Sequence, residues 1–460
     1  MTRTILALAT IAVVALPSQG RAQLSLRDAL ARADERAYAN RIATATADAQ
    51  AAQALQPYRG ILPSLRVEAG FVRSNHPIAV TGTKLSQRLL SNADFNPATL
   101  NFPDAVGNKS AGLVIEQPLV NADAWIGRTA AGDAAKAQSA AADWTRGGTR
   151  TDVVRAFYGA TLAAEKRATL VAAERAAQAH VARAKALADT GLVTRSDALL
   201  AEVRAGEITT QRLAASGDAS HAARALAVLL GDPAASYVLP ESLPASERIR
   251  ALVAADTADR AFAMRADVKA ATLALDAARA DALRAKSVYL PRLNGFARYD
   301  WNDKNGFFAN ERSWTAGVMA SWSLFAGASD VAEVRGSNAR ARSAATQREA
   351  AAANADLERA RTRDALQVAL LQLDIAERAV TQSAEAHRIV ARKYDGGLAT
   401  ISDLLEAQAL ETQSRLGLSF ARYQLLVTAA ERRQALGSDP SFLTALDSAS
   451  QSNNTDRAQR

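Results

Sequence analysis

The sequence of 460 residues contains no cysteine, only 12 prolines and 5% aromatic residues. The absence of cysteine excludes disulfide bonds, thiolate metal sites and the lipidated cysteine that follows a lipoprotein signal. Scarce proline and abundant alanine favour long helices over compact domains of mixed structure. Beyond residue 22, no stretch is apolar enough for a membrane-spanning helix, so entry into a membrane would have to use strands.

Residues 1–22 have the pattern of a secretory signal peptide. Arg3 precedes an apolar run that ends at Leu16, and Gly20 and Ala22 are the small residues that suit cleavage before Gln23. A membrane anchor is the alternative, but the run is shorter than the roughly 20 residues that span a bilayer. We expect export without a lipid anchor.

The formal net charge is +8, and basic and acidic residues are interleaved rather than grouped. Solvated helical surfaces explain this pattern better than a nucleic-acid site, which would combine a basic patch with aromatic residues. The histidines His76, His180, His221 and His387 show no metal-ligand spacing, and the sequence has no hydrolase, P-loop or zincin motif. We therefore expect no catalytic or metal site, no cofactor and no nucleic-acid partner.

One nine-residue stretch occurs twice. Residues 191–199 read GLVTRSDAL and residues 397–405 read GLATISDLL, each within a long alanine-rich segment of helical character. The glycine tolerates the left-handed backbone of a helix end, and the following threonine and serine can cap a new helix. This pattern predicts two helical hairpin tips in a duplicated chain.

Each half of the sequence predicts the same order of elements: helix, strand, strand, long helix, tip and shorter helix. The spacing from Gly191 to Gly231 equals that from Gly397 to Gly437, at 40 residues. An exposed loop at residues 72–110 is expected between the first two strands, because it is rich in Asn, Pro, Gly, Thr and Ser. After the signal peptide at 1–22, the first repeat is expected at 23–231, with strands at about 64–72 and 111–120 and a tip at 191–199. An equatorial linker is expected at 232–258. The second repeat is expected at 259–437, with strands at about 292–301 and 313–325 and a tip at 397–405, and a polar C-terminal tail follows at 438–460.

The fourth strand has the clearest alternation. Trp314, Ala316 and Val318 alternate with Ser313 and Thr315, which is typical of a barrel strand with one lipid-facing side. A soluble sandwich with one wet face is the alternative. Four strands per chain are fewer than the roughly eight of the smallest membrane barrels, so several copies would have to share one barrel.

Through the duplicated strand pairs, the equal helical arms and the two Gly-Leu-x-Thr tips, residues 24–437 resemble the TolC-like outer-membrane efflux protein family. The resemblance implies a mainly α fold with a small β part, in which a homotrimer forms a twelve-stranded outer-membrane β-barrel continued by an α-helical coiled-coil tunnel in the periplasm. It implies an exit duct of a tripartite efflux or type I secretion system. The implied partners are outer-membrane lipid, a periplasmic membrane-fusion adaptor and, through it, an inner-membrane pump of RND, ABC or MFS type. A periplasmic coiled-coil adaptor or scaffold without a barrel is the alternative.

The resemblance also implies roles for tip residues. In the family the tips meet the adaptor, and a purely structural helix end is the alternative for Gly and Leu. In the family, hydrogen bonds and ion pairs between the hairpins close the periplasmic aperture of the tunnel. Here Ala399 stands where the best-known member has an arginine. Asp403 and Glu406 share a helix face and resemble the carboxylate rings of the family's cation-binding constriction, with a solvated face as the alternative. The adaptor contacts are Gly191, Leu192, Thr194, Gly397, Leu398 and Thr400, and the gating residues are Arg195, Ser196, Asp197 and Tyr394.

Overall fold

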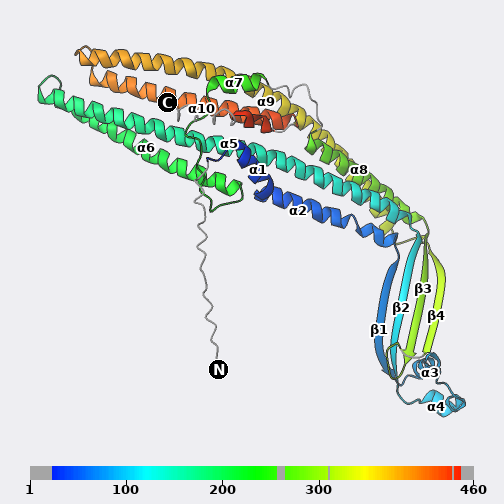
Figure 1. Cartoon of the computed structure of the whole chain (residues 1–460). Coiled ribbons are helices and arrows are strands. Elements are labelled where there is room, and N and C mark those ends of the chain that lie inside the picture. Colours follow the sequence, from blue (N-terminus) through cyan, green and yellow to red (C-terminus); the bar gives the residue numbers. More distant parts are fainter. Residues whose placement is uncertain (1–22, 256–264, 309–310, 438–439, 447–460) are drawn as a thin grey trace, which may run out of the picture. The chain divides into compact units, whose positions relative to one another are not determined.

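The computed structural model describes residues 23–255, 265–308, 311–437 and 440–446 (Figure 1). The predicted signal peptide at residues 1–22 lies outside the described residues. The chain divides into two compact units, each built from segments that are far apart in the sequence. Unit 1 comprises the described parts of Met1–Arg41, Arg146–Ala263 and Glu358–Arg460, and unit 2 those of Ile42–Thr145 and Met264–Leu357.

Long helices dominate the described chain, and a small antiparallel sheet accompanies them, as the sequence predicts. The helices α5 and α9 have 68 and 67 residues, and each is followed by a helix of 35 residues, α6 or α10. None of the described helices combines the length and the hydropathy of a membrane-spanning helix. The helices are α1 (Leu26–Arg36), α2 (Tyr38–Gln53), α3 (Pro77–Ser86), α4 (Pro97–Asn101), α5 (Ala122–Asp189), α6 (Arg195–Leu229), α7 (Ser246–Ala254), α8 (Ala266–Lys286), α9 (Ser329–Asp395) and α10 (Ile401–Ala435), with 3-10 turns η1 (Gln56–Gly60), η2 (Asn92–Phe95), η4 (Ser287–Tyr289) and η5 (Pro440–Leu446).

The first helix of the repeat, which the sequence predicts as a single element, is interrupted. Ser25 caps α1, because its hydroxyl accepts a hydrogen bond from the Asp28 N–H at 3.1 Å. The chain then leaves helical geometry at Ala37, with φ −55° and ψ 131°, and resumes as α2. The buried Asn40 donates its side-chain amide to the carbonyl of Ala33 at 3.0 Å, which compensates part of the break.

The core of unit 1 is an apolar cluster that draws on helices from both halves of the chain. Its fully buried side chains come from α1, α5, α6, α7, α9, α10 and η5, and include Leu26, Phe157, Leu226, Ile249, Leu373, Leu425 and Leu443. Burial of each such side chain contributes about 1.5–3 kcal/mol. A few large buried side chains therefore hold the alanine-rich helices of unit 1 together.

Two segments of unit 1 are more ordered than the sequence predicts. The expected linker at 232–258 carries α7, and the Leu243 N–H within it donates to the carboxylate of Glu165 at 2.8 Å. In the expected polar tail at 438–460, η5 buries Leu443 and Leu446 in the core. The remaining residues of that tail lie outside the described part of the chain. The polar composition around these segments conceals the few apolar residues that anchor them.

The sheet of unit 2 has the order β1-β2-β3-β4, with every neighbouring pair antiparallel (Figure 1). The strands are β1 (Ser64–Ser74), β2 (Val106–Val120), β3 (Arg292–Asp303) and β4 (Glu311–Ser321). The two strand pairs of the repeats therefore join through β2 and β3. Because β4 ends at Ser321, Trp322 and Leu324 follow the strand, whereas the sequence places them within it.

The two faces of the sheet differ in polarity. Directly paired residues lie on the same face, and side chains alternate between faces along each strand. The apolar face carries Leu65, Val67, Phe71, Leu113, Ile115, Tyr299, Trp301, Trp314 and Val318. The polar face carries Arg66, Glu68, Glu116, Arg298, Asp300, Ser313 and Thr315. This is the alternation that the sequence predicts.

Ion pairs cross the polar face. Arg298 contacts Asp300 at 2.8 Å and Glu68 at 3.3 Å, and so links β3 to β1 over the intervening strand. Gly112 of β2 makes this crossing possible, because a Cβ there would lie 2.9 Å from the Asp300 carboxylate. Arg66 adds a contact to Glu68 at 3.4 Å.

The connection between β1 and β2 is folded, where the sequence predicts an exposed loop. It contains α3, η2 and α4, and we call residues 75–105 the α3–α4 lobe (Figure 1). Lys84 of α3 pairs with Asp94 of η2 at 2.6 Å. Asn, Pro and Ser cap the short helices of this lobe, which explains why its composition is typical of a loop.

Candidate functional site

Both hairpin tips end their long helix in the same way. The N–H groups of Gly191 and Leu192 donate to carbonyls of the last turn of α5, and those of Gly397 and Leu398 to the last turn of α9, at 2.8–3.0 Å. The φ angles of the two glycines are +77° and +72°, in the left-handed region that favours glycine. These are Schellman ends, so the glycines have a structural task in addition to any contact they make.

The tip leucines are exposed. Leu192 keeps 73% and Leu398 80% of its surface accessible, although in many Schellman ends the corresponding residue packs on its own helix. A Cβ added to Gly191 or Gly397 would meet no atom within 4 Å. Each tip therefore presents an apolar side chain beside open backbone.

A capping box starts the return helix of each hairpin. The Thr194 hydroxyl accepts from the Asp197 N–H at 3.3 Å, and the Asp197 carboxylate accepts from the Thr194 N–H at 3.0 Å. Thr400 and Asp403 make the same pair of bonds at 3.2 and 2.8 Å. The backbone N–H of Thr400, followed by its hydroxyl, lowers the pKa of Asp403. The predicted contact residues Thr194 and Thr400 and the carboxylates Asp197 and Asp403 are thus engaged in local bonds that hold the tips.

The other predicted tip residues are solvent-exposed. Ser196 shares a 2.6 Å hydrogen bond with the Thr194 hydroxyl, and Arg195 extends from the same turn. Glu406 is exposed one turn beyond Asp403, on the same side of α10. The predicted gating and carboxylate-ring roles of these residues would involve other copies of the chain, so they stay predictions.

Tyr394 joins the two hairpins. Its buried ring packs in a cluster with residues of both hairpins, among them Ala198 of the first and Ile401 of the second. Burial, followed by the negative charge of Asp197, raises the pKa of its phenol. Among the described residues its hydroxyl has no hydrogen-bond partner. Tyr394 therefore contributes apolar packing between hairpins of one chain.

The structure adds an ion pair that the sequence analysis missed. Arg183 of α5 contacts Asp395 at the end of α9 at 2.8 Å, which connects the two hairpins near their tips. Lys185 of α5 instead contacts Glu202 of α6 at 2.5 Å, within the first hairpin. Arg183 and Lys185 are two positions apart and point to different sides of α5, but the sequence carries no signal of which partner each one meets.

Two of the four histidines also meet. The rings of His180 on α5 and His387 on α9 lie 6.2 Å apart, and His387 Nδ1 is 2.5 Å from the carboxylate of Glu411 on α10. Burial, followed by the charges of His387 and Arg183, lowers the pKa of His180. Among the described residues, no group of three His, Cys, Asp or Glu side chains is placed to hold a metal ion.

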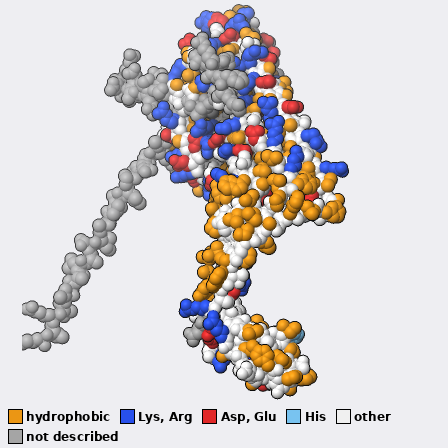
Figure 2. Space-filling view, turned by 90° about the vertical axis from the view of Figure 1, so that its right-hand side faces the viewer, with side chains coloured by type: hydrophobic (Ala, Val, Ile, Leu, Met, Phe, Trp, Pro, Cys, Tyr) orange, Lys and Arg blue, Asp and Glu red, His pale blue; other side chains and the backbone are white. Residues whose placement is uncertain are grey.

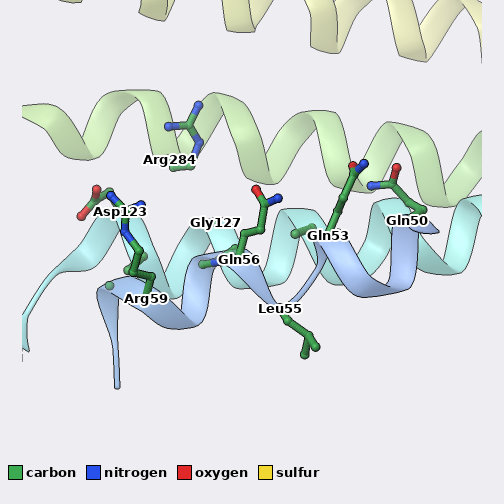
Figure 3. A pocket seen from close by; sticks show the side chains of 12 residues that line it. Gln50, Gln53, Leu55, Gln56, Arg59, Asp123, Gly127 and Arg284 are labelled. Atoms are coloured by element: carbon green, nitrogen blue, oxygen red, sulfur yellow. The ribbon is translucent and has the colours of Figure 1, made fainter. Parts of the chain in front are cut away.

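A groove of about 940 Å³ lies in unit 2, between the α2–η1 segment and the beginning of α5 (Figure 3). Gln53 and Gln56 extend towards α8 in this view, whereas Leu55 points away. Two of the charged groups at its rim are paired, since Asp123 contacts Arg292 at 2.7 Å and Arg284 contacts Asp281 at 2.7 Å. The groove thus contains no arrangement of groups that indicates catalysis.

Comparison with known proteins finds a family for the second half of the chain. Residues 257–438 match the sequence model of the outer membrane efflux protein family. A comparison with curated protein sequences found no match.

Several solved structures have the same fold. The outer membrane protein VceC of Vibrio cholerae aligns with a TM-score of 0.74 and 20% identity, over 90% of this chain and 96% of that one. A membrane protein of Pseudomonas aeruginosa gives 0.75 and 19%, over 90% and 92%. The CmeC outer membrane channel of Campylobacter jejuni gives 0.74 and 16%, over 100% and 99%. Residues 257–438 thus match the outer membrane efflux protein family, and the chain as a whole has the fold of these outer-membrane channel structures.

Proposed function

We propose that this protein is the outer-membrane exit duct of a tripartite efflux or type I secretion system. It conducts substrates passively from an inner-membrane pump and a periplasmic adaptor to the exterior, and its helical part lies in the periplasm. The outer membrane efflux domain at residues 257–438 supports this proposal, because that family consists of transport channels rather than enzymes.

The observation that carries the proposal is the exposed apolar face of the sheet. Trp314 and Leu65 on this face are 74% and 68% accessible, at opposite edges of the sheet. Figure 2 shows hydrophobic side chains along the strands and where helices meet them. Soluble monomers rarely expose so continuous an apolar surface, whereas lipid covers it without cost. A soluble periplasmic scaffold would not be built in this way.

Three copies would complete the membrane part. In the described chain, β1 and β4 each pair with one neighbour only, so each has an edge with unpaired backbone groups. An open edge within hydrocarbon is unfavourable, because each unpaired N–H or C=O costs several kcal/mol. Three four-stranded sheets joined edge to edge give a closed barrel of twelve strands, with the polar face and its Arg298 ion pairs turned towards water.

Aromatic residues support the same membrane position. Trp125 of α5 is exposed beside the sheet, and the indole N–H of Trp322 donates to the carbonyl of Tyr289 at 3.1 Å, at the end of the sheet where the helices begin. Tryptophan and tyrosine favour the boundary between lipid and water. We place the periplasmic boundary of the membrane at these residues.

The tips are the proposed adaptor site. Leu192 and Leu398 are exposed apolar anchors on two equivalent turns, and exposed leucines beside glycine backbone allow close approach by a partner helix. Closure of the aperture rests on contacts between hairpins, in which we include Tyr394 and Arg183 beside Arg195, Ser196 and Asp197. Asp403 and Glu406 would form carboxylate rings that favour cations.

The test is the native mass of the protein after detergent extraction from isolated outer membranes, followed by planar-bilayer recording. Three copies per particle with ion conductance are expected. A water-soluble monomer or dimer in the periplasmic fraction would refute the duct and support a scaffold instead.

A further inference from the structure

The α3–α4 lobe is attached to the polar face at the end of the sheet where β2 and β4 begin. The side-chain amide of Gln87, at the end of α3, donates to Asn108 Oδ1 at 2.8 Å and to the Gly107 carbonyl at 2.9 Å. The guanidinium of Arg88 contacts the carboxylate of Glu311 on β4 at 3.0 Å. By the strand register, Asn108 and Glu311 both belong to the polar face. The lobe therefore reaches from β2 across to β4 on the polar side of the sheet.

The lobe is held together by polar contacts of its own. Lys84, followed by the N–H of Ser91, lowers the pKa of Asp94 to about 2. The Asn96 side chain accepts from the Ala98 N–H at 2.9 Å and so caps α4. This segment is a small folded element in a fixed place, and the short β3–β4 connection of the second repeat has no such element among its described residues.

The surface of the lobe is nevertheless apolar. Phe102 and Ile78 are 87% and 79% accessible, which are among the highest values for large apolar side chains in the described chain. Phe95, Leu85 and Leu89 are exposed as well. Figure 2 shows hydrophobic side chains gathered on this lobe, beyond the end of the sheet. A large exposed apolar patch on a folded element marks a candidate contact surface.

We propose that the exposed apolar residues of the α3–α4 lobe pack against the same residues of the neighbouring copies and so constrict the outer mouth of the channel. This inference rests on the proposed trimeric barrel. The lobe is attached on the polar side of the sheet, and that side encloses the water-filled lumen. Lipid is on the opposite side of the barrel wall, so the surfaces available to cover Phe102 and Ile78 are the other two lobes.

The proposed contact joins identical patches of symmetry-related copies. A closed ring of three copies presents the same patch three times around one axis, so a patch near that axis meets its own equivalents. Removal of large apolar side chains from water supplies the attraction, at about 25 cal/mol per Å² of apolar surface. The Arg88–Glu311 pair and the Gln87 bonds attach each lobe to the barrel wall and set how far it reaches inwards.

The first experiment is cysteine cross-linking in isolated outer membranes, which is clean because the natural chain has no cysteine. Phe102→Cys and, separately, Ile78→Cys are treated with a short bis-maleimide. Cross-linked dimers are expected for both. The matched control is Phe71→Cys, since Phe71 is also an exposed phenylalanine but lies on the apolar face of β1, and it should yield none.

The second experiment measures the width of the mouth from outside intact cells. Thr315→Cys places a thiol on the polar face of β4, where a small impermeant maleimide should label it. A 5-kDa maleimide polymer is expected to label Thr315→Cys at least ten times faster in the triple variant that also carries Ile78→Ser and Phe102→Ser than in the single variant. Conductance is not used, because an aperture at the other end could limit it.

The outcomes separate this inference from the proposed function. Loss of the trimer, measured as native mass on the same preparations, would refute the proposed function itself. With trimers intact, equal labelling of Thr315→Cys in both backgrounds would overturn the constriction. Phe102→Cys that reacts freely with a water-soluble maleimide would overturn it in favour of exposure to solvent, and protection from the reagent without cross-linking would indicate lipid contact and overturn it as well.

Discussion

Arg183 of the first hairpin lies 2.8 Å from Asp395 of the second, so one ion pair connects the two hairpins of a chain close to their tips. Both side chains are about half exposed, and such pairs contribute about 0.2–1 kcal/mol. The contribution to stability is small, but a change of this size shifts an equilibrium between closed and open tips about fivefold at most.

We expect Arg183→Ala to increase the open-state conductance events of the purified channel by up to about fivefold without loss of the trimer. The matched control is Lys185→Ala, which removes a pair of equal kind within the first hairpin. The measurement is single-channel recording in planar bilayers. Equal behaviour of the two variants would show that contacts between the hairpins do not govern opening.

The tip leucines test the adaptor site. Leu192→Ser and Leu398→Ser remove two exposed apolar side chains. At an interface, the minority of residues that carry the binding each cost more than about 1 kcal/mol when truncated, and the proposal places both leucines in that minority. Export of a compound that requires this protein to leave the cell should fall, while trimers remain intact. Leu213→Ser is the control, at an exposed leucine on α6 that is 58% accessible and lies away from the tips. Unimpaired export in the double variant would remove the leucines from the proposed site.

A test of the proposed carboxylate ring needs a control, because one of its two residues also caps a helix. Asp403 closes a capping box with Thr400, whereas Glu406 has no such bond in the described structure. Glu406→Gln should lower cation selectivity, measured as the reversal potential in a KCl gradient, with unchanged thermal stability. Asp403→Asn should lower both the cation selectivity and the thermal stability.

The equivalent cap of the first hairpin distinguishes the two effects of the aspartate. Asp197→Asn removes the same charge from a capping box of the same geometry. If it reduces selectivity as much as Asp403→Asn does, the effect arises from a loosened tip rather than from a specific ring. A selectivity unchanged in Glu406→Gln would count against the ring itself.

The histidine cluster predicts acid sensitivity of the helical part. Burial and the neighbouring charges of His387 and Arg183 lower the pKa of His180 in the folded state. The unfolded chain then binds more protons than the folded chain as the pH falls below about 6.5, so the free energy of unfolding decreases with falling pH. Other charges beside the cluster are Asp395, Glu411 and Arg415.

Thermal unfolding in detergent between pH 7.5 and 5 tests this expectation. The midpoint should fall less in His180→Gln than in the unchanged protein. His221→Gln, at an exposed position on α6, is the control and should behave as the unchanged protein does. An unaltered pH profile in His180→Gln would assign the acid sensitivity to other groups.

Gly231, at the end of α6, tests the packing of unit 1. Its φ is +74°, and a Cβ would lie 2.2 Å from the carbonyl oxygen of Arg36 at the end of α1. Gly231→Ala should destabilise the fold by more than the 1–3 kcal/mol or so of backbone strain alone. Gly217→Ala, in the open middle of α6, should instead stabilise it by about 0.5–1 kcal/mol. Equal melting midpoints of the two variants would contradict this account.

Local chemistry explains what could be predicted from the sequence. Gly191 and Gly397 with their following threonines specify helix ends and caps through bonds to residues three or four positions away. The alternation from Ser313 to Val318 specifies a strand with two unlike faces in the same way. The predicted tips, the four strands and the helix-rich class required no knowledge of distant contacts.

Segments with mixed signals were predicted less well. In the α3–α4 lobe the residues that cap short helices are also those of loops, so composition does not distinguish the two. In the linker and the tail, the buried residues Leu243, Ile249, Leu443 and Leu446 belong to short segments bordered by polar residues. Their burial depends on a core assembled from other parts of the chain.

The sequence alone determined the repeat, the tips and the two-faced strands, because periodicity and capping act over a few residues. Tertiary structure alone decided that β2 pairs with β3, that Arg183 meets Asp395 rather than Glu202, that His180 meets His387, and that the α3–α4 lobe lies on the polar face of the sheet. These partners are far apart in the chain, and long polar helices offer many equivalent basic and acidic positions. Only packing of the apolar residues selects which of them come together.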